Sequence, residues 1–129
     1  MGTFSGFSFM NRYLAVMLGG AFGSLVRYAI GMAVAEHWQG RFPIGTFCIN
    51  VTGSFFIGLA LTLIPEQGPQ YLRPLLVTGV LGGYTTFSAF EWETFVAPRG
   101  VAILYVVASV GLGLLACWAG ASLARVIVD

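Results

Sequence analysis

The sequence predicts an all-α integral membrane protein with four transmembrane helices, the third of them broken at mid-membrane. The first observation is composition, because 57% of the 129 residues are hydrophobic and only 9% are charged. A soluble domain uses about a quarter of its residues as charges. The second is a set of four long apolar runs, and the third is a series of polar or small residues at helical spacing inside them. Lipid is the solvent that fits this pattern.

The four apolar runs cover residues 13–35, 45–64, 72–95 and 101–127. Each is about 20 residues or longer, enough for a helix to cross ~30 Å of hydrocarbon. Short breaks rich in proline, glycine and polar residues separate them, as expected for loops. No room remains for a soluble domain, so residues 1–129 are predicted to form one transmembrane domain.

The arginines are spread almost evenly over the two sides of the membrane that four spans define. One side carries Arg12, Arg73 and Arg125, and the other carries Arg41 and Arg99. A bias of three against two is weak for the positive-inside rule, so either orientation is energetically accessible. Dual topology is therefore a hypothesis from the sequence.

The second run carries a polar or small residue at every fourth position: Thr46, Asn50, Ser54, Gly58 and Thr62. The fourth run repeats the arrangement with Tyr105, Ser109, Gly113, Cys117, Ala121 and Arg125, and the first run has Gly19, Gly23, Arg27 and Gly31. Close helix packing explains such stripes, especially in the first run. Asn50 leaves two readings open, an interhelical clamp or a pore-lining group, because a carboxamide inside a membrane needs a partner.

The third run reads Gly-Gly-Tyr-Thr-Thr-Phe-Ser-Ala-Phe from residue 82 to residue 90. Adjacent glycines and β-branched threonines weaken a continuous helix, so a break is expected here. A break frees backbone carbonyls, which suit a hard cation if they are not satisfied by nearby hydroxyls. Phe87 and Phe90 lie three residues apart beyond it and share a helix face. Their ring edges carry partial positive charge and could contact an anion.

The stripes offer neutral donors and no acid, base or nucleophile cluster. They contain no Asp, Glu, Lys or His at mid-membrane, and His37, the only histidine, falls in a predicted loop. Amide, hydroxyl and ring-edge groups can replace water around a small anion without trapping it. An enzyme is therefore not expected. The net charge of +1 offers no basic patch for nucleic acid.

Three blocks resemble the CrcB/Fluc family of fluoride channels: residues 19–28, GGAFGSLVRY; residues 45–58, GTFCINVTGSFFIG; and residues 79–93, GVLGGYTTFSAFEWE. The resemblance spans almost the whole chain, and the third block is the most specific. It implies a passive channel that exports fluoride from the bacterial cytoplasm through the inner membrane. It also implies an antiparallel, dual-topology homodimer with two pores.

The resemblance also implies roles for individual residues. Arg27 matches a vestibule arginine, and Glu93 matches an acidic residue after the phenylalanine pair. The backbone carbonyls of Gly82 and Thr85 match those that hold a structural sodium ion at the dimer interface. The fluoride pathway is expected to involve Asn50, Phe87, Phe90, Tyr105 and Ser109, with Thr86 and Ser88 as further candidates.

Two positions depart from the family pattern. Gly113 stands where many members have a second serine, and Ala89 replaces a frequent threonine between the phenylalanines. Both changes remove a hydroxyl near the expected pathway. The alternatives are a small proton-coupled exporter, which needs a membrane carboxylate that the first run lacks, and a packing subunit of a membrane complex.

Overall fold

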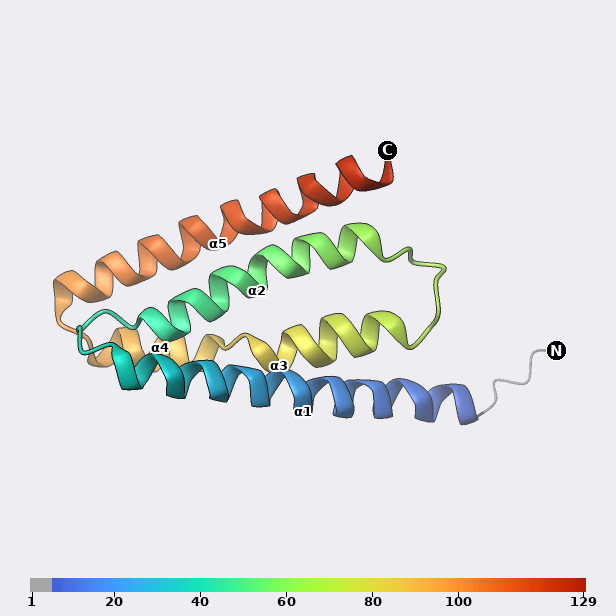
Figure 1. Cartoon of the computed structure of the whole chain (residues 1–129), viewed down its shortest axis with the longest axis horizontal. Coiled ribbons are helices and arrows are strands. Elements are labelled where there is room, and N and C mark those ends of the chain that lie inside the picture. Colours follow the sequence, from blue (N-terminus) through green and yellow to red (C-terminus); the bar gives the residue numbers. More distant parts are fainter. Residues whose placement is uncertain (1–5) are drawn as a thin grey trace.

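The computed structural model describes residues 6–129, and these residues form helices joined by short loops. The long helices are α1 (Gly6–His37), α2 (Ile44–Leu63) and α5 (Arg99–Val128). Between α2 and α5 lie a π-helical segment, η1 (Pro74–Leu81), a single turn, α3 (Gly82–Tyr84), and α4 (Phe87–Val96). The chain runs along the molecule four times, so α1 begins and α5 ends at the same end (Figure 1).

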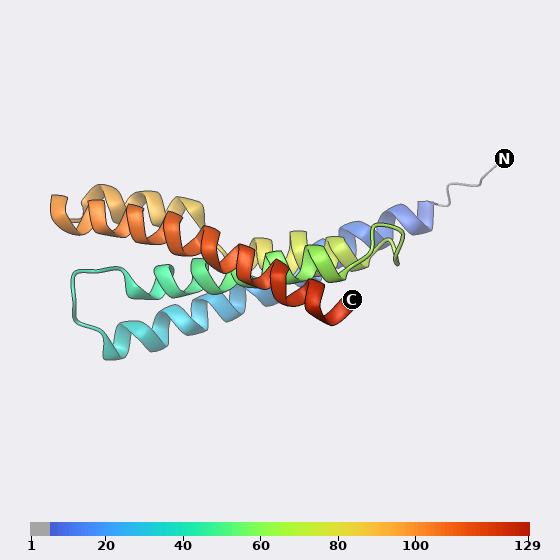
Figure 2. The same ribbon diagram turned by 90° about the horizontal axis from the view of Figure 1, so that it is seen from above.

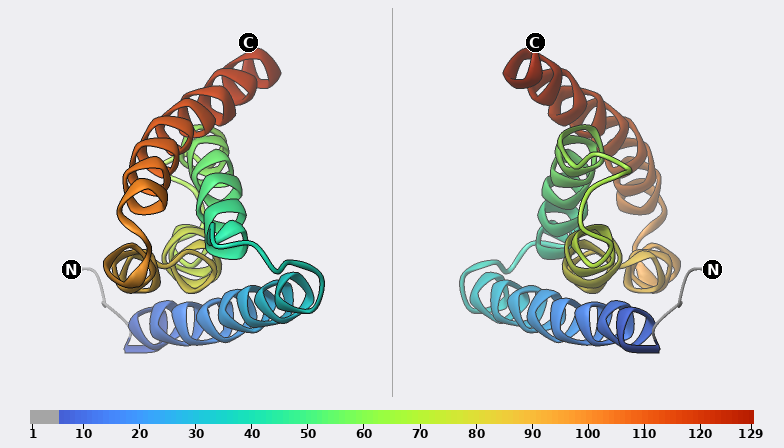
Figure 3. Two further views of the ribbon diagram at one scale, coloured as in Figure 1. Left: turned by 90° about the vertical axis from the view of Figure 1, so that its left-hand side faces the viewer. Right: turned by 90° about the vertical axis from the view of Figure 1, so that its right-hand side faces the viewer.

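The elements form an elongated bundle in which α1 and α5 lie on opposite sides (Figures 1 and 3). Helix α1 packs mainly on η1 and α3, whereas α5 packs mainly on α2. At the end that holds the loop of residues 38–43, α4 runs beside α5 and α1 runs beside α2, as Figure 2 shows. The segments η1 and α3 therefore lie between α1 and α2, whereas α4 lies at the side of the bundle next to α5 (Figure 3).

Glycines make the two main helix contacts possible. On α2, a β-carbon at Gly58 would collide with the carbonyl of Cys117 on α5. On α1, a β-carbon at Gly23 would collide with the carbonyl of Val80 on η1, whereas one at Gly31 would meet nothing. Small residues let helix backbones approach closely inside a membrane. The packing interpretation of the stripe on α1 thus holds for Gly23 but not for Gly31.

Most large apolar side chains face outward. Within the described residues, the buried apolar side chains are only Ala15, Ile49, Ile64, Tyr105 and Ala124. Three helices are long and apolar enough to cross a membrane, over Phe9–His37, Ile44–Leu63 and Arg99–Val128. An outward apolar surface on helices of this length is suited to lipid. The prediction of an all-helical membrane protein is confirmed at this level.

The predicted run 72–95 is divided among η1, α3 and α4, none of which is long enough to span a membrane alone. Helix α3 ends at Tyr84 and helix α4 begins at Phe87, and Thr85 and Thr86 between them have extended backbone. The amide of Thr85 still donates to the carbonyl of Leu81, at 3.0 Å, and is the last amide to do so before the break. The prediction that His37 falls in a loop was wrong. His37 is the last residue of α1, where its Nδ1 lies 2.8 Å from the carbonyl oxygen of Ala33.

Candidate functional site: two pockets around Thr86

The site is built around the two extended residues between α3 and α4. Thr86 has φ −150° and ψ 116°, and its Oγ1 accepts a hydrogen bond of 3.3 Å from the amide of Ala89. It therefore caps the start of α4, which satisfies one of the free amides there. The hydroxyl of Thr85 donates to the carbonyl of Leu81 at 2.9 Å, so it turns back onto the preceding helical segment.

Asn50 on α2 holds Thr86 with both ends of its carboxamide. Its Nδ2 donates to the carbonyl of Thr86 at 3.0 Å, and its Oδ1 accepts from the amide of Thr86 at 2.9 Å. The side chain thus does for Thr86 what a neighbouring strand would do for an extended residue. Because Nδ2 carries two hydrogens, a second donor remains for another acceptor.

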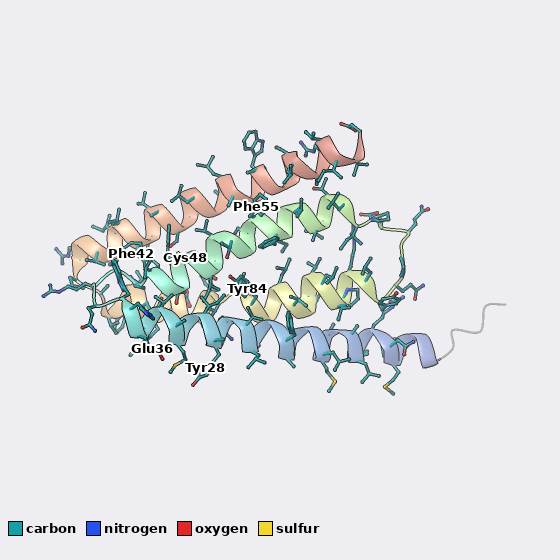
Figure 4. All side chains as sticks on the ribbon, in the orientation of Figure 1. Tyr28, Glu36, Phe42, Cys48, Phe55 and Tyr84 are labelled. Carbon is teal, nitrogen blue, oxygen red and sulfur yellow. The ribbon has the colours of Figure 1, made fainter. Side chains whose placement is uncertain are left out.

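Two further side chains fix the neighbouring turn α3. Arg27 on α1 donates from Nε to the carbonyl of Gly83 at 3.0 Å, and Ser24 lies 3.5 Å from the same oxygen. On the other side, the hydroxyls of Thr52 and Tyr84 share a hydrogen bond of 2.8 Å. Figure 4 shows Tyr84 between α2 and α3, in line with that bond. Helices α1 and α2 therefore hold these residues from both sides.

A pocket of about 340 Å³ opens beside Thr86 and contains polar groups but no charged side chain. Its lining residues include Asn50, Ser54, Gly82, Thr85, Thr86, Phe87, Phe90 and Ser109. The rings of Phe87 and Phe90 lie 5.8 Å apart, and Phe87 is 69% exposed in the single chain. We call this cavity the neutral pocket.

Ser109 supplies a hydroxyl to the neutral pocket from α5. Its Oγ is buried and has no hydrogen-bond partner among the described residues. A buried hydroxyl without a partner costs about 1–3 kcal/mol. The hydroxyl is therefore available to a ligand that can accept a hydrogen bond.

A second pocket, of about 590 Å³, lies on the other side of Thr86. Its lining includes Arg27, Thr46 and Glu93, so we call it the charged pocket. Thr86 lines both pockets and is the residue where they meet. The charged pocket opens between α1, α2 and α4, whereas the neutral pocket opens between α2, η1, α4 and α5.

Glu93 joins three elements through its two carboxylate oxygens. Oε1 accepts from Thr46 on α2 at 2.7 Å, and Oε2 accepts from the hydroxyl of Tyr105 on α5 at 2.7 Å. Tyr105 is fully buried, and its ring lies 5.0 Å from that of Phe90. The hydrogen bond from its hydroxyl to Glu93, together with this ring contact, holds the tyrosine in one orientation.

The structure brings most of the residues expected on the pathway together, but not all. Those that line the neutral pocket are Asn50, Thr86, Phe87, Phe90 and Ser109. Tyr105 is not in that lining and lies behind Phe90, whereas Ser88 is exposed on α4 and lines neither pocket. Arg27 lines the charged pocket.

The pairing of Glu93 with Thr46 and Tyr105 was not predicted. A signal was present, because Glu93 follows Phe90 by three residues and so shares its face of α4. Of the two departures from the family pattern, Ala89 lines a pocket, whereas Gly113 lines neither and lies beside Ser54. A β-carbon at Gly113 would lie 3.5 Å from Ser54 Oγ, and Ala89 lines the charged pocket.

Carboxylate, thiol and imidazole groups do not form a metal site in the described part of the chain. The backbone offers another kind of ligand. In a continuous helix, the amides of Thr86 and Ala89 would donate to the carbonyls of Gly82 and Thr85. Here those amides donate to Asn50 and to the Thr86 hydroxyl instead. The carbonyls of Gly82 and Thr85 therefore lose their helical donors.

The sequence of this chain is similar to those of known proteins. The family model described as CrcB-like protein, Camphor Resistance, matches residues 14–121. The chain belongs to the CrcB-like family. A relative from Solibacter usitatus named fluoride-specific ion channel FluC is 52% identical over 120 residues, which cover 88% of this chain and 98% of the relative.

Two other CrcB-like relatives carry the same printed name. The one from Acidobacterium capsulatum is 49% identical, over 84% of this chain and 92% of its own length. The one from Rhizobium meliloti is 45% identical, over 92% of this chain and 100% of its own length. The family resemblance seen in the sequence is confirmed. With its apolar helices, this CrcB-like chain is a multi-pass bacterial membrane protein of an ion-channel family, not an enzyme.

Proposed function

We propose that this CrcB-like protein is a passive, fluoride-selective channel that exports fluoride from the bacterial cytoplasm. The relatives named fluoride-specific ion channels support the ion's identity. The observation that carries the proposal is the neutral pocket, where amide, hydroxyl and aromatic groups converge without a charged side chain. Such groups can replace an anion's hydration shell yet let it leave, as conduction requires.

The pathway runs from the charged pocket past Thr86 into the neutral pocket. Arg27 raises the local concentration of anions at the entrance. Its Nε is engaged by the Gly83 carbonyl, but the guanidinium has further donors. Asn50, Thr86 and Ser109 then offer hydrogen-bond donors, and Phe87 and Phe90 offer ring edges. Tyr105 supports the pathway from behind Phe90. Ser88 is exposed on α4, so it would line the pathway only if another surface covered this face of α4.

Besides the three long helices, the segments η1, α3 and α4 together form one more membrane crossing, the third in chain order, which is broken at Thr85 and Thr86. The chain direction supports this proposal, because these segments run antiparallel to α2 along the length of the bundle (Figure 1). Non-helical backbone inside a membrane must be satisfied by protein or line a cavity. Asn50 and Arg27 supply partners for the Thr86 and Gly83 carbonyls.

The active unit is an antiparallel homodimer in which the second subunit covers the neutral pocket. The high exposure of Phe87 in one chain supports a covering partner. The nearly even distribution of arginines supports insertion in both orientations. Cysteine accessibility from the two sides of the membrane tests this arrangement, and labelling from one side alone would exclude it.

A structural sodium ion is held by the backbone carbonyls of Gly82 and Thr85. These carbonyls have lost their helical amide donors to Asn50 and to the Thr86 hydroxyl, so they are suited to a hard cation. Both residues line the open neutral pocket, where the second subunit would add its own carbonyls. The ion would supply charge that stabilises the break and the dimer.

The test is anion efflux from liposomes that contain the purified protein. The proposal predicts fluoride efflux that is faster than in protein-free liposomes, with chloride retained. Equal fluoride and chloride efflux would exclude selectivity. No fluoride efflux from a preparation that elutes as a single folded species would exclude the channel.

A further inference from the structure

A continuous series of aromatic rings links the first loop to the neutral pocket. Phe42, in the loop before α2, lies edge-on to Tyr105 with ring centroids 5.4 Å apart and planes at 78°. Tyr105 lies 5.0 Å from Phe90, and Phe90 lies 5.8 Å from Phe87. Phe42 is thus the only loop residue in the series, and Figure 4 shows it where α1 passes into α2.

The backbone of Phe42 is held in place by two donors. Its carbonyl accepts from Trp38 Nε1 at 2.8 Å and from the amide of Ile44 at 2.8 Å. Pro43 between them has φ −74° and ψ 68°, the angles of an inverse γ-turn. Proline fixes φ near this value, so the turn needs little further ordering. The loop therefore presents the Phe42 ring from a rigid base.

Phe42 supports the ring of Tyr105, whereas Glu93 binds its hydroxyl group. The carboxylate holds the hydroxyl end of Tyr105, whereas Phe42 and Phe90 contact its ring. Edge-to-face ring contacts are directional, because the positive rim of one ring meets the negative face of the other. Phe47 packs on Phe42 in turn, at 5.3 Å and 74°. The orientation of Tyr105 is therefore fixed at both ends.

We infer that Phe42 is a positioning residue for the anion pathway: it holds the Tyr105 ring against Phe90, and so sets where the ring edges of Phe90 and Phe87 meet the ion. Phe42 itself lines neither the neutral nor the charged pocket. Its action on the ion is therefore indirect. This inference rests on the proposed fluoride channel, and it adds a loop residue to the elements that shape its pathway.

The test compares Phe42→Leu and Phe42→Tyr with the unmodified protein in fluoride and chloride efflux. Leucine keeps apolar bulk but removes the ring, so fluoride efflux should fall roughly two- to tenfold, the range for loss of one aromatic contact. Tyrosine keeps the ring and should retain efflux. Phe56→Leu is the matched control, because Phe56 is 49% exposed and pairs only with Phe55 in the ring contacts of the described residues.

A double-substitution cycle separates positioning from general loss of structure. If Phe42 acts through the Tyr105 ring, Phe42→Leu should slow efflux much less in a Tyr105→Leu background, where that ring is already gone, since coupled residues are not additive. All variants are compared per amount of protein that elutes as one folded species, and Phe42→Met replaces the leucine variant if that variant does not fold. Unchanged efflux in folded Phe42→Leu or Phe42→Met, or full additivity in the cycle, would overturn the inference. If instead the proposed channel function is wrong, the unmodified protein itself will show no fluoride efflux.

Discussion

Asn50 and Thr86 are joined by two hydrogen bonds, of 3.0 Å and 2.9 Å, that pair one carboxamide with both backbone groups of one extended residue. A single side chain of α2 therefore supports the point where helical hydrogen bonding is interrupted. The same interaction diverts the Thr86 amide from the carbonyl of Gly82. The sequence left a clamp and a pore-lining role open for Asn50, and the geometry allows one side chain to serve both.

Asn50→Asp should weaken this clamp. A carboxylate can still accept from the Thr86 amide, but it cannot donate to the Thr86 carbonyl, and two oxygens would face each other. Loss of a bond that leaves a buried group unsatisfied costs about 1–3 kcal/mol. Thermal unfolding in detergent should show a lower midpoint, and fluoride efflux should be lost.

Thr62→Ala is the control for that experiment. Thr62 lies on the same helix, and its hydroxyl bonds only within that helix, to the carbonyl of Gly58 at 2.8 Å. Its removal should change little. If Asn50→Asp were as stable and as active as Thr62→Ala, the clamp would not support the break.

Gly113→Ser should be tolerated and should place a hydroxyl beside Ser54, which lines the neutral pocket. The new β-carbon would lie 3.5 Å from Ser54 Oγ, which is an ordinary contact. The free energy of unfolding should change by no more than about 0.5 kcal/mol, as for substitutions without a clash. Fluoride efflux should match or exceed that of the unmodified protein.

The matched control is Gly120→Ser on the same helix. A β-carbon there would collide with the carbonyl of Phe55 on α2, so overpacking should cost about 1–3 kcal/mol or more. The ratio of folded to aggregated protein in size-exclusion chromatography compares the two variants. Equal losses in both would contradict the packing described for α2 and α5.

Helix α1 offers a similar pair. Gly23→Ala should destabilise the protein by about 1–3 kcal/mol, because the new methyl group would meet the Val80 carbonyl. Gly31→Ala meets nothing and should be neutral or slightly stabilising, since alanine favours helix. Thermal unfolding midpoints measure both. A stable Gly23→Ala variant would show that α1 and η1 do not pack as described.

Part of this architecture follows directly from sequence. Long apolar runs and proline- or glycine-rich breaks were enough to predict the three helices of spanning length, because each signal is local. The position of the interruption was also local, since the two glycines and two threonines near residue 85 all disfavour continuous helix. The boundaries differ by a few residues, as at His37, where α1 continues beyond the predicted span.

The partners of individual side chains could not be read in the same way. Arg27 was expected as a vestibule group, but it also binds the Gly83 carbonyl, 56 positions away, and that contact was not predicted. The pair of Phe42 and Tyr105 joins a loop to a helix, and no periodic pattern links them. Such contacts depend on how separate elements pack, and local spacing carries no information on that.

Removal of sodium should destabilise the protein if the Gly82 and Thr85 carbonyls bind it. A ligand present at 100 times its dissociation constant stabilises the state that binds it by about 2.7 kcal/mol. Exchange of sodium for a large organic cation at constant ionic strength should therefore lower the thermal midpoint of the purified protein. Identical midpoints in both salts would contradict the sodium site.

The central claim is that fluoride passes through the neutral pocket, and fluoride efflux from liposomes with Phe87→Ile and Phe95→Ile tests it most directly. Both phenylalanines lie on α4 and are strongly exposed in the single chain, at 69% and 81%, but only Phe87 lines the pocket. We predict fluoride efflux without chloride efflux in the unmodified protein and in Phe95→Ile, and loss of fluoride efflux in folded Phe87→Ile. Equal fluoride efflux from both variants would contradict a pathway through this pocket.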